Sequence, residues 1–294
     1  MTHIFTTENH NPWYNLAIEN WLFHRNDLEK KEILFIHQNE PSVIIGRFQN
    51  PWLECRLAEM KVNNINFVRR HSGGGAVYHD LGNSNFTFIS PGKDFSRSDK
   101  TNLIINALNS LGITAIQGKR YDIYVQGKKV SGSASKFTSK GVIHHGTLLL
   151  NADLEALNNY LSSIHYKNDL IKSKGINSVR SEVGNLIDLN QSVSHENMTS
   201  SIINQIEHEA LINIEIEKIK LLPEIDNYYK KLISWDWLFG NTPGFFTTKN
   251  IIDNGKEISV EFYIKKGIIA EIKTDNSRLN QLYLNQPCNI LFTS

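Results

Sequence analysis

The stretch RRHSGGGAVYHDLGNSNFT, residues 69–87, carries the strongest functional pattern in this chain of 294 residues. Three consecutive glycines, 73–75, have no side chains, so their backbone can adopt positive φ angles and bring N–H groups close to a ligand. Arg70 precedes them with a permanent charge whose planar guanidinium can grip a phosphate or carboxylate with two bonds. Val77 and Tyr78 follow as apolar walls. The stretch predicts an anion-binding loop, with a plain sharp corner between two strands as the alternative.

Regular elements are expected on both sides of this loop. Asn11 before Pro12 is typical of a helix start, because Asn caps free N–H groups and Pro has no N–H to lose. Further helices are predicted at 52–61 and 98–111. Apolar runs bounded by turn formers predict strands at 32–37, 42–46, 65–70, 76–79 and 85–90, followed by a three-stranded meander at 121–126, 128–133 and 142–150.

The C-terminal half is predicted to be mostly helical from residue 153 to about residue 237. Gly and Pro interrupt that pattern at 239–246, so we predict a catalytic domain at 1–243 and a small accessory domain at 244–294. The small piece is too short to stand alone and should lean on the large domain. The predicted fold class is α/β of the α+β type, a mixed and largely antiparallel sheet flanked by helices. Two strands are expected in the small domain, at 257–265 and 268–274.

The bulk composition excludes several classes of protein. Lys and Arg number 31 against 30 Asp and Glu, so the basic surplus of a nucleic-acid-coating surface is missing. No apolar run approaches the roughly 20 residues of a membrane span, and the N-terminus has no targeting pattern. Cys55 and Cys288 lie far apart, without the spacing of a disulfide framework or a zinc site. We therefore expect a cytoplasmic protein, by default a monomer, that binds neither nucleic acid nor membrane.

Two further motifs follow the glycine-rich loop. In KKVSGSASK, residues 128–136, a lysine at the start of a strand is a candidate for stabilising charge at a reacting phosphate, although an exposed basic turn is the simpler interpretation for Lys128 and Lys136. In IHHGTLLLNADL, residues 143–154, the paired histidines lack metal-site spacing and predict a packed strand with one hydrogen-bonded histidine. Walker, G-x-G-x-x-G and G-x-S-x-G patterns do not occur, which excludes the common phosphate cradles and the hydrolase elbow.

Taken in order, these motifs resemble lipoate–protein ligase A and its lipoyltransferase relatives. The resemblance covers nearly everything from Asn11 to Phe245. It implies the fold shared with biotin protein ligases, followed by a small C-terminal domain. The resemblance is carried by six motifs: NPWYNLAIE (11–19), RRHSGGGAVYHDLGN (69–83), KVSGSA (129–134), HHGTLLLNADL (144–154), KGINSVRSEVGNL (174–186) and ISWDWLFGNTPGF (233–245).

The resemblance also implies a function and a set of site residues. Such an enzyme activates lipoate with ATP and Mg²⁺ to lipoyl-AMP, then transfers the lipoyl group to a lysine of an apo lipoyl domain in a 2-oxoacid dehydrogenase E2 subunit, or of the glycine-cleavage H protein. Lys129 is implied as the catalytic residue, at the α-phosphate and the adenylate carbonyl, and Arg70 as a phosphate contact. No metal ligand from the protein is implied. The other implied contacts to ATP or lipoyl-AMP are Ser72, Gly75, Ala76, Val77, Tyr78, Asn83, Asp122, Ser131 and His145.

Departures from the family pattern leave alternatives open. His37 stands where many relatives carry an aromatic residue, and the segment after Phe245 is shorter than the small domain of the bacterial ligases. A lipoyltransferase that uses only preformed lipoyl-AMP is therefore one alternative, and a non-catalytic binder of lipoate or lipoyl-adenylate is another. Transfer through a thioester on Cys55 or Cys288 is disfavoured, because neither has a recognisable activating environment. Biotin ligation is disfavoured because RRHSGGG replaces its G-R-G-R-x-G-R pattern.

Overall fold

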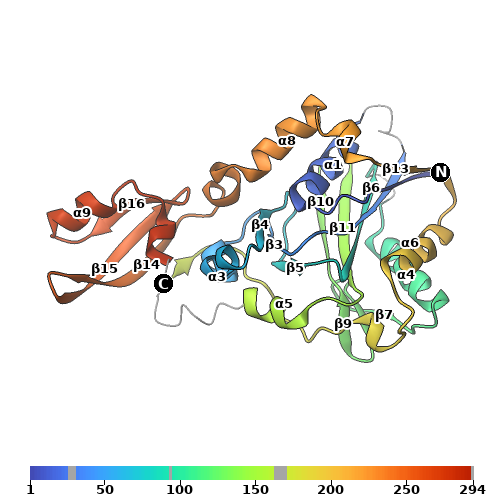
Figure 1. Cartoon of the computed structure of the whole chain (residues 1–294), viewed down its shortest axis with the longest axis horizontal. Helices are drawn as coiled ribbons and strands as arrows, with labels where there is room; N and C mark the ends of the chain where they lie inside the picture. Colours follow the sequence, from blue (N-terminus) through green and yellow to red (C-terminus); the bar gives the residue numbers. More distant parts are fainter. Residues whose placement is uncertain (26–30, 93–94, 162–170, 293–294) are drawn as a thin grey trace.

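The computed structural model describes residues 1–25, 31–92, 95–161 and 171–292. At its centre lies a six-stranded sheet in the order β10-β11-β6-β2-β1-β13 (Figure 1). Strand β1 runs parallel to both of its neighbours, and the other pairs are antiparallel. The predicted mixed, largely antiparallel sheet is therefore confirmed. Its strands are β1 (Thr2–Thr6), β2 (Glu32–His37), β6 (Asn83–Ser90), β10 (Ser133–Phe137), β11 (Val142–Leu149) and β13 (His208–Asn213).

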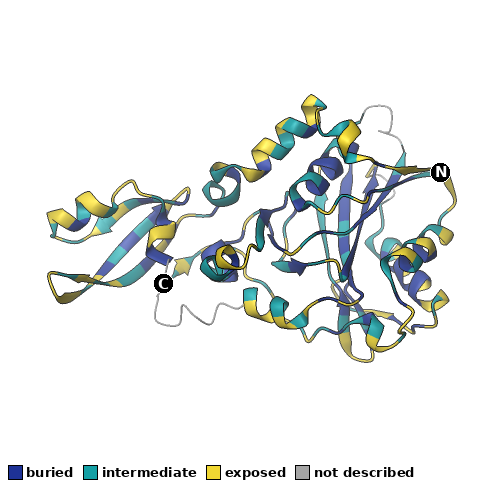
Figure 2. Cartoon of the chain, viewed as in Figure 1, coloured by how far each residue is buried: buried dark blue, intermediate teal, exposed yellow. Residues whose placement is uncertain are grey.

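The two faces of the sheet carry separate apolar cores. Side chains alternate between the faces of a strand, so Leu34 and Ile36 of β2 pack with helices α4 and α6, while Ile33 and Phe35 pack with α1 and α8. Figure 2 shows these buried residues concentrated along the strands and the inner sides of the helices. The covering helices are α1 (Pro12–His24), α4 (Arg97–Ser110), α6 (His195–Asn204) and α8 (Pro223–Ile233).

The start of α1 is the one predicted from the sequence. The side-chain oxygen of Asn11 accepts hydrogen bonds from the N–H groups of Trp13 and Tyr14, at 3.1 Å each, and Pro12 occupies the first helical position. Because these contacts fix the entry of the chain, α1 directs Leu16 and Glu19 toward the central sheet, where both line a cavity.

A second, three-stranded sheet carries the glycine-rich loop between two of its strands. The predicted helix 52–61 is wrong in one respect, because the chain is extended at Cys55 and divides it into two short helices. Burial of Cys55 with Val43 and Met60 explains the break, since a continuous helix would carry this side chain away from that core. The elements here are β3 (Ser42–Ile45), β4 (Asn66–Arg69), β5 (Val77–His79), α2 (Pro51–Glu54), α3 (Leu57–Val62) and α5 (Leu154–Tyr160).

The predicted meander at 121–150 is wrong, although its strands exist. Strands β7 (Ile116–Gln117), β8 (Ile123–Val125) and β9 (Lys128–Ser131) form a separate sheet in that order, whereas β10 and β11 belong to the central sheet. The chain passes from one sheet to the other at Gly132, whose carbonyl accepts the N–H of Thr147. Alternating apolar residues indicate a strand but not its partner sheet, which explains the error.

The prediction of mostly helical structure at 153–237 holds only in part, and residues 162–170 lie outside the described chain. Residues 174–185 run largely without regular structure, and β13 joins the central sheet. The irregular segment is held instead by side-chain bonds, because Ser178 contacts both Glu54 and Ala76. The remaining elements before residue 241 are β12 (Lys172–Ser173), η3 (Leu186–Asp188), α7 (Ile216–Ile219) and η4 (Asp236–Gly240).

Three strands of the C-terminal part pair with β12 in a fourth sheet, in the order β12-β14-β15-β16, and this part extends away from the large body (Figure 1). As expected, the C-terminal part packs against that body: the ring centroid of Trp52 lies 5.5 Å from that of Phe245 and 5.8 Å from that of Phe292. The sequence did not predict β14, and the boundary at residue 243 stays a prediction. No helix in the described ranges has the length and apolarity to cross a membrane. The elements are β14 (Phe245–Asp253), β15 (Lys256–Lys265), β16 (Ile268–Lys273), α9 (Ser277–Tyr283) and η5 (Cys288–Phe292).

Candidate active site

Two adjoining cavities lie where the glycine-rich loop meets the central sheet. The first has a volume of about 380 Å³ and lies against α1 and strands β2, β6 and β11. The second has a volume of about 570 Å³ and lies between β5, β9 and residues 171–183. Residues that line both cavities mark their junction, and they are Ala76, Val77, Lys129, Gly132, Thr147, Asn177, Ser178 and Val179.

Lys129 is the cation at this junction. Its Nζ atom lies 2.9 Å from Oδ1 of Asp122, and the two side chains are 19% and 8% exposed. Its backbone is fixed as well, because its N–H donates to the carbonyl of Glu182 and its carbonyl accepts the N–H of Gly184. Within the described chain Asp122 is the single ion-pair partner of the ammonium group, which leaves donors for a ligand.

The glycine-rich loop is held from inside by Arg70. Its guanidinium donates to the carbonyls of Ile44 at 3.0 Å and of Gly73 and Gly75 at 2.7 Å each. Gly74 has a φ of +86°, a conformation that favours glycine. Burial lowers the pKa of Arg70 to about 10, so the group stays charged at neutral pH. The structure thus shows Arg70 organising the loop, and its predicted phosphate contact stays a prediction.

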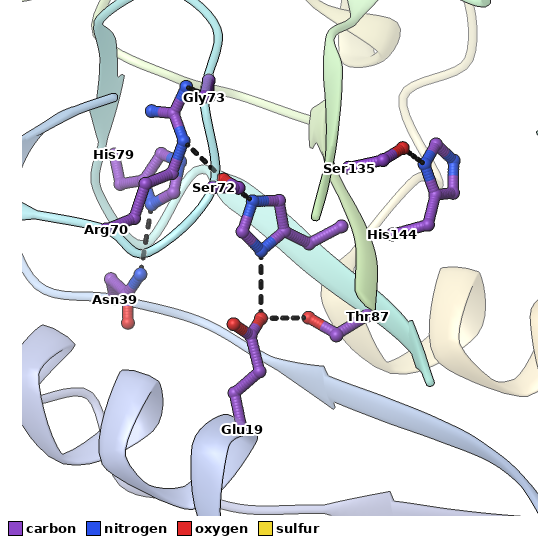
Figure 3. Close-up of polar contacts among 10 residues, drawn as sticks. Glu19, Asn39, Arg70, Ser72, Gly73, His79, Thr87, Ser135 and His144 are labelled. Carbon is purple, nitrogen blue, oxygen red and sulfur yellow. Dashed lines mark hydrogen bonds and ion pairs between the residues drawn. The ribbon is translucent and has the colours of Figure 1, made fainter. Parts of the chain in front are cut away.

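A chain of buried polar contacts joins this loop to α1 and the central sheet (Figure 3). The Nε atom of Arg70 donates to Ser72, whose Oγ lies 2.6 Å from Nε2 of His145. On its other side His145 lies 2.9 Å from the carboxylate of Glu19, which also accepts from Thr87 at 2.8 Å. Burial raises the pKa of Glu19, but His145 and Thr87 outweigh it, so that pKa lies below its ordinary value. The anion is therefore a stable part of the cavity wall.

Most of the residues predicted for the site come together here. Both Ser72 and Asn83 lie outside the cavity linings. Ser72 reaches the first cavity through His145, and Asn83 is fully buried with its amide donating to Asp80. Of the predicted residues, the first cavity is lined by Arg70, Gly75, Asp122 and His145, the second by Tyr78 and Ser131, and both by Ala76, Val77 and Lys129.

Other lining residues were missed in the sequence. The prediction of a single hydrogen-bonded histidine in the paired motif is also incomplete, because His144 bonds to Ser135 at 2.9 Å in addition to the contacts of His145. Strand alternation could have indicated the missed residues, because side chains opposite one another in neighbouring strands lie on the same face of the sheet. The missed lining residues include Glu19, His37, Asn39, His79, Thr87 and Ser178.

The two cysteines have the properties of core residues. Cys55 and Cys288 are free and fully buried, and burial raises the pKa of both thiols, so neither is a poised nucleophile. Neither lines the two cavities. The residues described contain no cluster of three or more His, Cys, Asp or Glu suited to a metal ion. The charged groups that line the first cavity include Lys129 and the buried Glu19, which is bonded to His145.

The similarity to known proteins agrees with this geometry. The family model for the lipoyl protein ligase A/B catalytic domain matches residues 11–207, so the chain belongs to the lipoyl protein ligase A/B family. Lipoate-protein ligase A of Psychrobacter cryohalolentis is 39% identical over 280 residues, which cover 92% of this chain and 81% of the relative. Lipoate-protein ligase A of Bdellovibrio bacteriovorus is 39% identical over 251 residues, covering 82% and 73%. The predicted family and enzyme class are confirmed.

Solved structures extend the agreement to the fold. P. falciparum LipL1 in complex with lipoate superposes with a TM-score of 0.70 at 28% identity, covering 91% of this chain and 86% of that one. A putative lipoate protein ligase from T. acidophilum with bound lipoic acid superposes with a TM-score of 0.62 at 25% identity, covering 78% and 93%. The predicted fold, with helices on both faces of a mixed sheet, is confirmed.

Proposed function

We propose that this chain is an ATP-dependent lipoate–protein ligase that uses Lys129 in both steps of the reaction. The observation that carries the proposal is the position of the Lys129 ammonium at the junction of two cavities. We assign the acyl chain of lipoate to the first cavity and the nucleotide of ATP to the second, so that carboxylate and α-phosphate meet at the lysine. The similar P. falciparum and T. acidophilum proteins, which bind lipoate in their solved complexes, support lipoate as the substrate.

In the first step a carboxylate oxygen of lipoate attacks the α-phosphorus of ATP, the bond to the β-phosphate breaks, and pyrophosphate leaves. Two anions meet in this step, so a fixed cation stabilises the transition state more than the separated substrates. Asp122 holds Nζ of Lys129 in place, and the loop organised by Arg70 offers backbone N–H groups to the anion. We assign Mg²⁺ to the phosphates of ATP, where one or two carboxylates suffice to hold it.

In the second step the amine of an acceptor lysine attacks the carbonyl carbon of lipoyl-AMP. An amide bond forms, the amine loses a proton, and AMP leaves with the bonding electrons. Negative charge builds on the carbonyl oxygen, and the ammonium of Lys129 stabilises it. We assign the acceptor to lipoyl domains of 2-oxoacid dehydrogenase E2 subunits or to the H protein, and expect a monomeric enzyme in the cytoplasm.

A transferase that accepts only preformed lipoyl-AMP is the second candidate. It is favoured by one observation, that no described residue after Val183 lines either cavity. The C-terminal part then contributes no described residue to the walls of either cavity. A protein that merely binds lipoyl-adenylate would release neither pyrophosphate nor AMP.

The two steps are separable by experiment. Purified protein is given lipoate, ATP and Mg²⁺, and pyrophosphate release is followed; separately, synthetic lipoyl-AMP and an apo lipoyl domain are supplied, and AMP release is followed. We expect lipoate-dependent release in the first assay and transfer in the second. Transfer without activation identifies the second candidate, and loss of both reactions refutes the proposed function.

A further inference from the structure

A strap, residues 172–183, lies along both cavities and has no role in the chemistry proposed above. One end of the strap is β12, which pairs with β14 of the C-terminal part. The other end lies beside Lys129, whose N–H donates to the carbonyl of Glu182 at 2.9 Å. Between these ends the strap has no regular structure, and Ser178 at its middle lines both cavities. The position of this wall therefore depends on side-chain contacts along the strap.

The hydroxyl of Ser178 fixes the middle of the strap. It accepts the N–H of Ala76 at 2.8 Å and a side-chain N–H of Gln49 at 3.0 Å, and it donates to the carboxylate of Glu54. The amide of Gln49 is oriented for this contact, because its oxygen accepts the N–H of Gly46 at 2.9 Å. A serine hydroxyl has one proton to donate and two lone pairs. All three are used within the protein, so Ser178 holds the strap in place instead of contacting a ligand.

Glu54 strengthens this attachment with a buried carboxylate. The residue is 8% exposed, and its two carboxylate oxygens also accept the backbone N–H of Ser178, at 3.2 and 3.3 Å. Hydrogen bonds to a carboxylate are roughly twice as strong as those between neutral groups. Glu54 is the last residue of α2, whose Trp52 is fully buried in the core that it shares with the C-terminal sheet. The carboxylate is therefore carried by a helix that is itself firmly packed.

The strap lies directly against the glycine-rich loop. A Cβ added at Gly75 would lie 3.0 Å from Oγ and 3.2 Å from Cβ of Ser178, so the close approach requires a glycine here. Residues 171–183 form one side of the second cavity, whereas the first cavity is bounded mainly by α1, the loop and strands of the central sheet. A displaced strap would therefore alter the second cavity more than the first.

We propose that Ser178 and Glu54 are positioning residues for the nucleotide, because together they hold the strap against the glycine-rich loop and so fix one wall of the second cavity. The inference rests on the proposed function, which assigns the nucleotide of ATP to that cavity. The two residues act as one unit. Without the hydroxyl, the N–H of Ala76 and the carboxylate both lose a partner, and without the carboxylate the hydroxyl loses its strongest acceptor.

A kinetic comparison tests the positioning. The KM for ATP and the KM for lipoate are measured by pyrophosphate release in the wild type, in Ser178→Ala and in Glu54→Gln. We expect the KM for ATP to rise about tenfold in each variant, the effect of one charge-assisted hydrogen bond, and the KM for lipoate to change less. Unfolding of a fraction of the molecules lowers kcat and leaves both KM values unchanged, so this pattern separates positioning from stability. The matched control Ser139→Ala, at an exposed position between β10 and β11, should keep both wild-type values.

The double variant Ser178→Ala, Glu54→Gln tests whether the two residues act as one unit. We expect its KM for ATP to equal that of the single variants, because removing either partner already frees the strap. An unchanged KM for ATP in the single variants, or effects that multiply in the double variant, overturns the inference. If the chain accepts only preformed lipoyl-AMP, the same comparison is made with the KM for lipoyl-AMP in the transfer reaction.

A failure of the proposed function looks different, because the wild type then releases neither pyrophosphate nor AMP. In that case the attachment of the strap is observed directly, by hydrogen exchange of backbone amides followed by NMR. Ser178→Ala should speed the exchange of the Ala76 N–H, whose acceptor it removes, and Ser139→Ala should not. Equal exchange at Ala76 in the wild type and in Ser178→Ala overturns the inference without any turnover.

Discussion

Lys129 combines a fixed position, a carboxylate partner and access to two cavities. We predict that Lys129→Ala reduces both pyrophosphate release and transfer from synthetic lipoyl-AMP by at least about 100-fold, the loss typical for one preorganised donor. The fold should persist, because Asp122 keeps a second cation, Nε of Arg120 at 3.8 Å, when the lysine is removed. Both assays and a thermal unfolding curve check this. Retention of either reaction near the wild-type rate contradicts the role assigned to the lysine.

Glu19 is the buried anion of the first cavity, and its effect on stability depends on pH. Its pKa in the folded protein lies below the ordinary value of 4.5, so the stabilisation is complete above that pH and is lost as pH falls through the folded pKa. We predict that Glu19→Gln lowers the free energy of unfolding at pH 7 by about 1–3 kcal/mol, because His145 loses a charged acceptor. Urea titrations at pH 7 and at pH 4 should show a smaller difference at the lower pH. An equal difference at both pH values argues against an ionised Glu19.

At the scale of elements, the chain changes sheets at Gly132, which lies against the side chain of Lys129. A Cβ added at Gly132 would lie 3.3 Å from Cε and 3.4 Å from Nζ of Lys129. We predict that Gly132→Ala displaces the ammonium from Asp122 and lowers kcat by about 10- to 100-fold, since small misplacements at a reacting centre have effects of that size. The melting temperature should change little. Wild-type kcat in this variant shows that the close approach has no catalytic consequence.

The elements also show what the sequence reveals and what it does not. Strand 32–37 and the helix start at Asn11 were predicted to the residue, because local alternation and capping determine them. Strand β14 and the sheet partners of β8 to β11 were not, because these depend on distant pairings. In the site, too, local motifs were predicted and contacts between distant segments were not. The glycine-rich motif indicated the loop and the family resemblance indicated Lys129, whereas the Glu19–His145 contact joins positions far apart in the chain.

For the whole molecule, Trp52 connects the large body to the C-terminal sheet. It is fully buried and shares one core with Phe245, Phe262 and Phe292. We predict that Trp52→Ala destabilises the protein by about 3–5 kcal/mol, as is typical for deletion of a buried aromatic ring. Urea unfolding followed by circular dichroism measures the change. The matched variant Trp235→Ala, at a partly exposed position, should lose less, and equal losses contradict the connecting role.

The central claim is that one chain both activates lipoate and attaches it to an acceptor. The most direct measurement is the mass of an apo lipoyl domain after incubation with the protein, lipoate, ATP and Mg²⁺. We predict a mass gain of one lipoyl group that requires ATP and that disappears with Lys129→Ala. No gain with ATP, together with a gain from synthetic lipoyl-AMP, would contradict the claim and leave the chain with the transfer step alone.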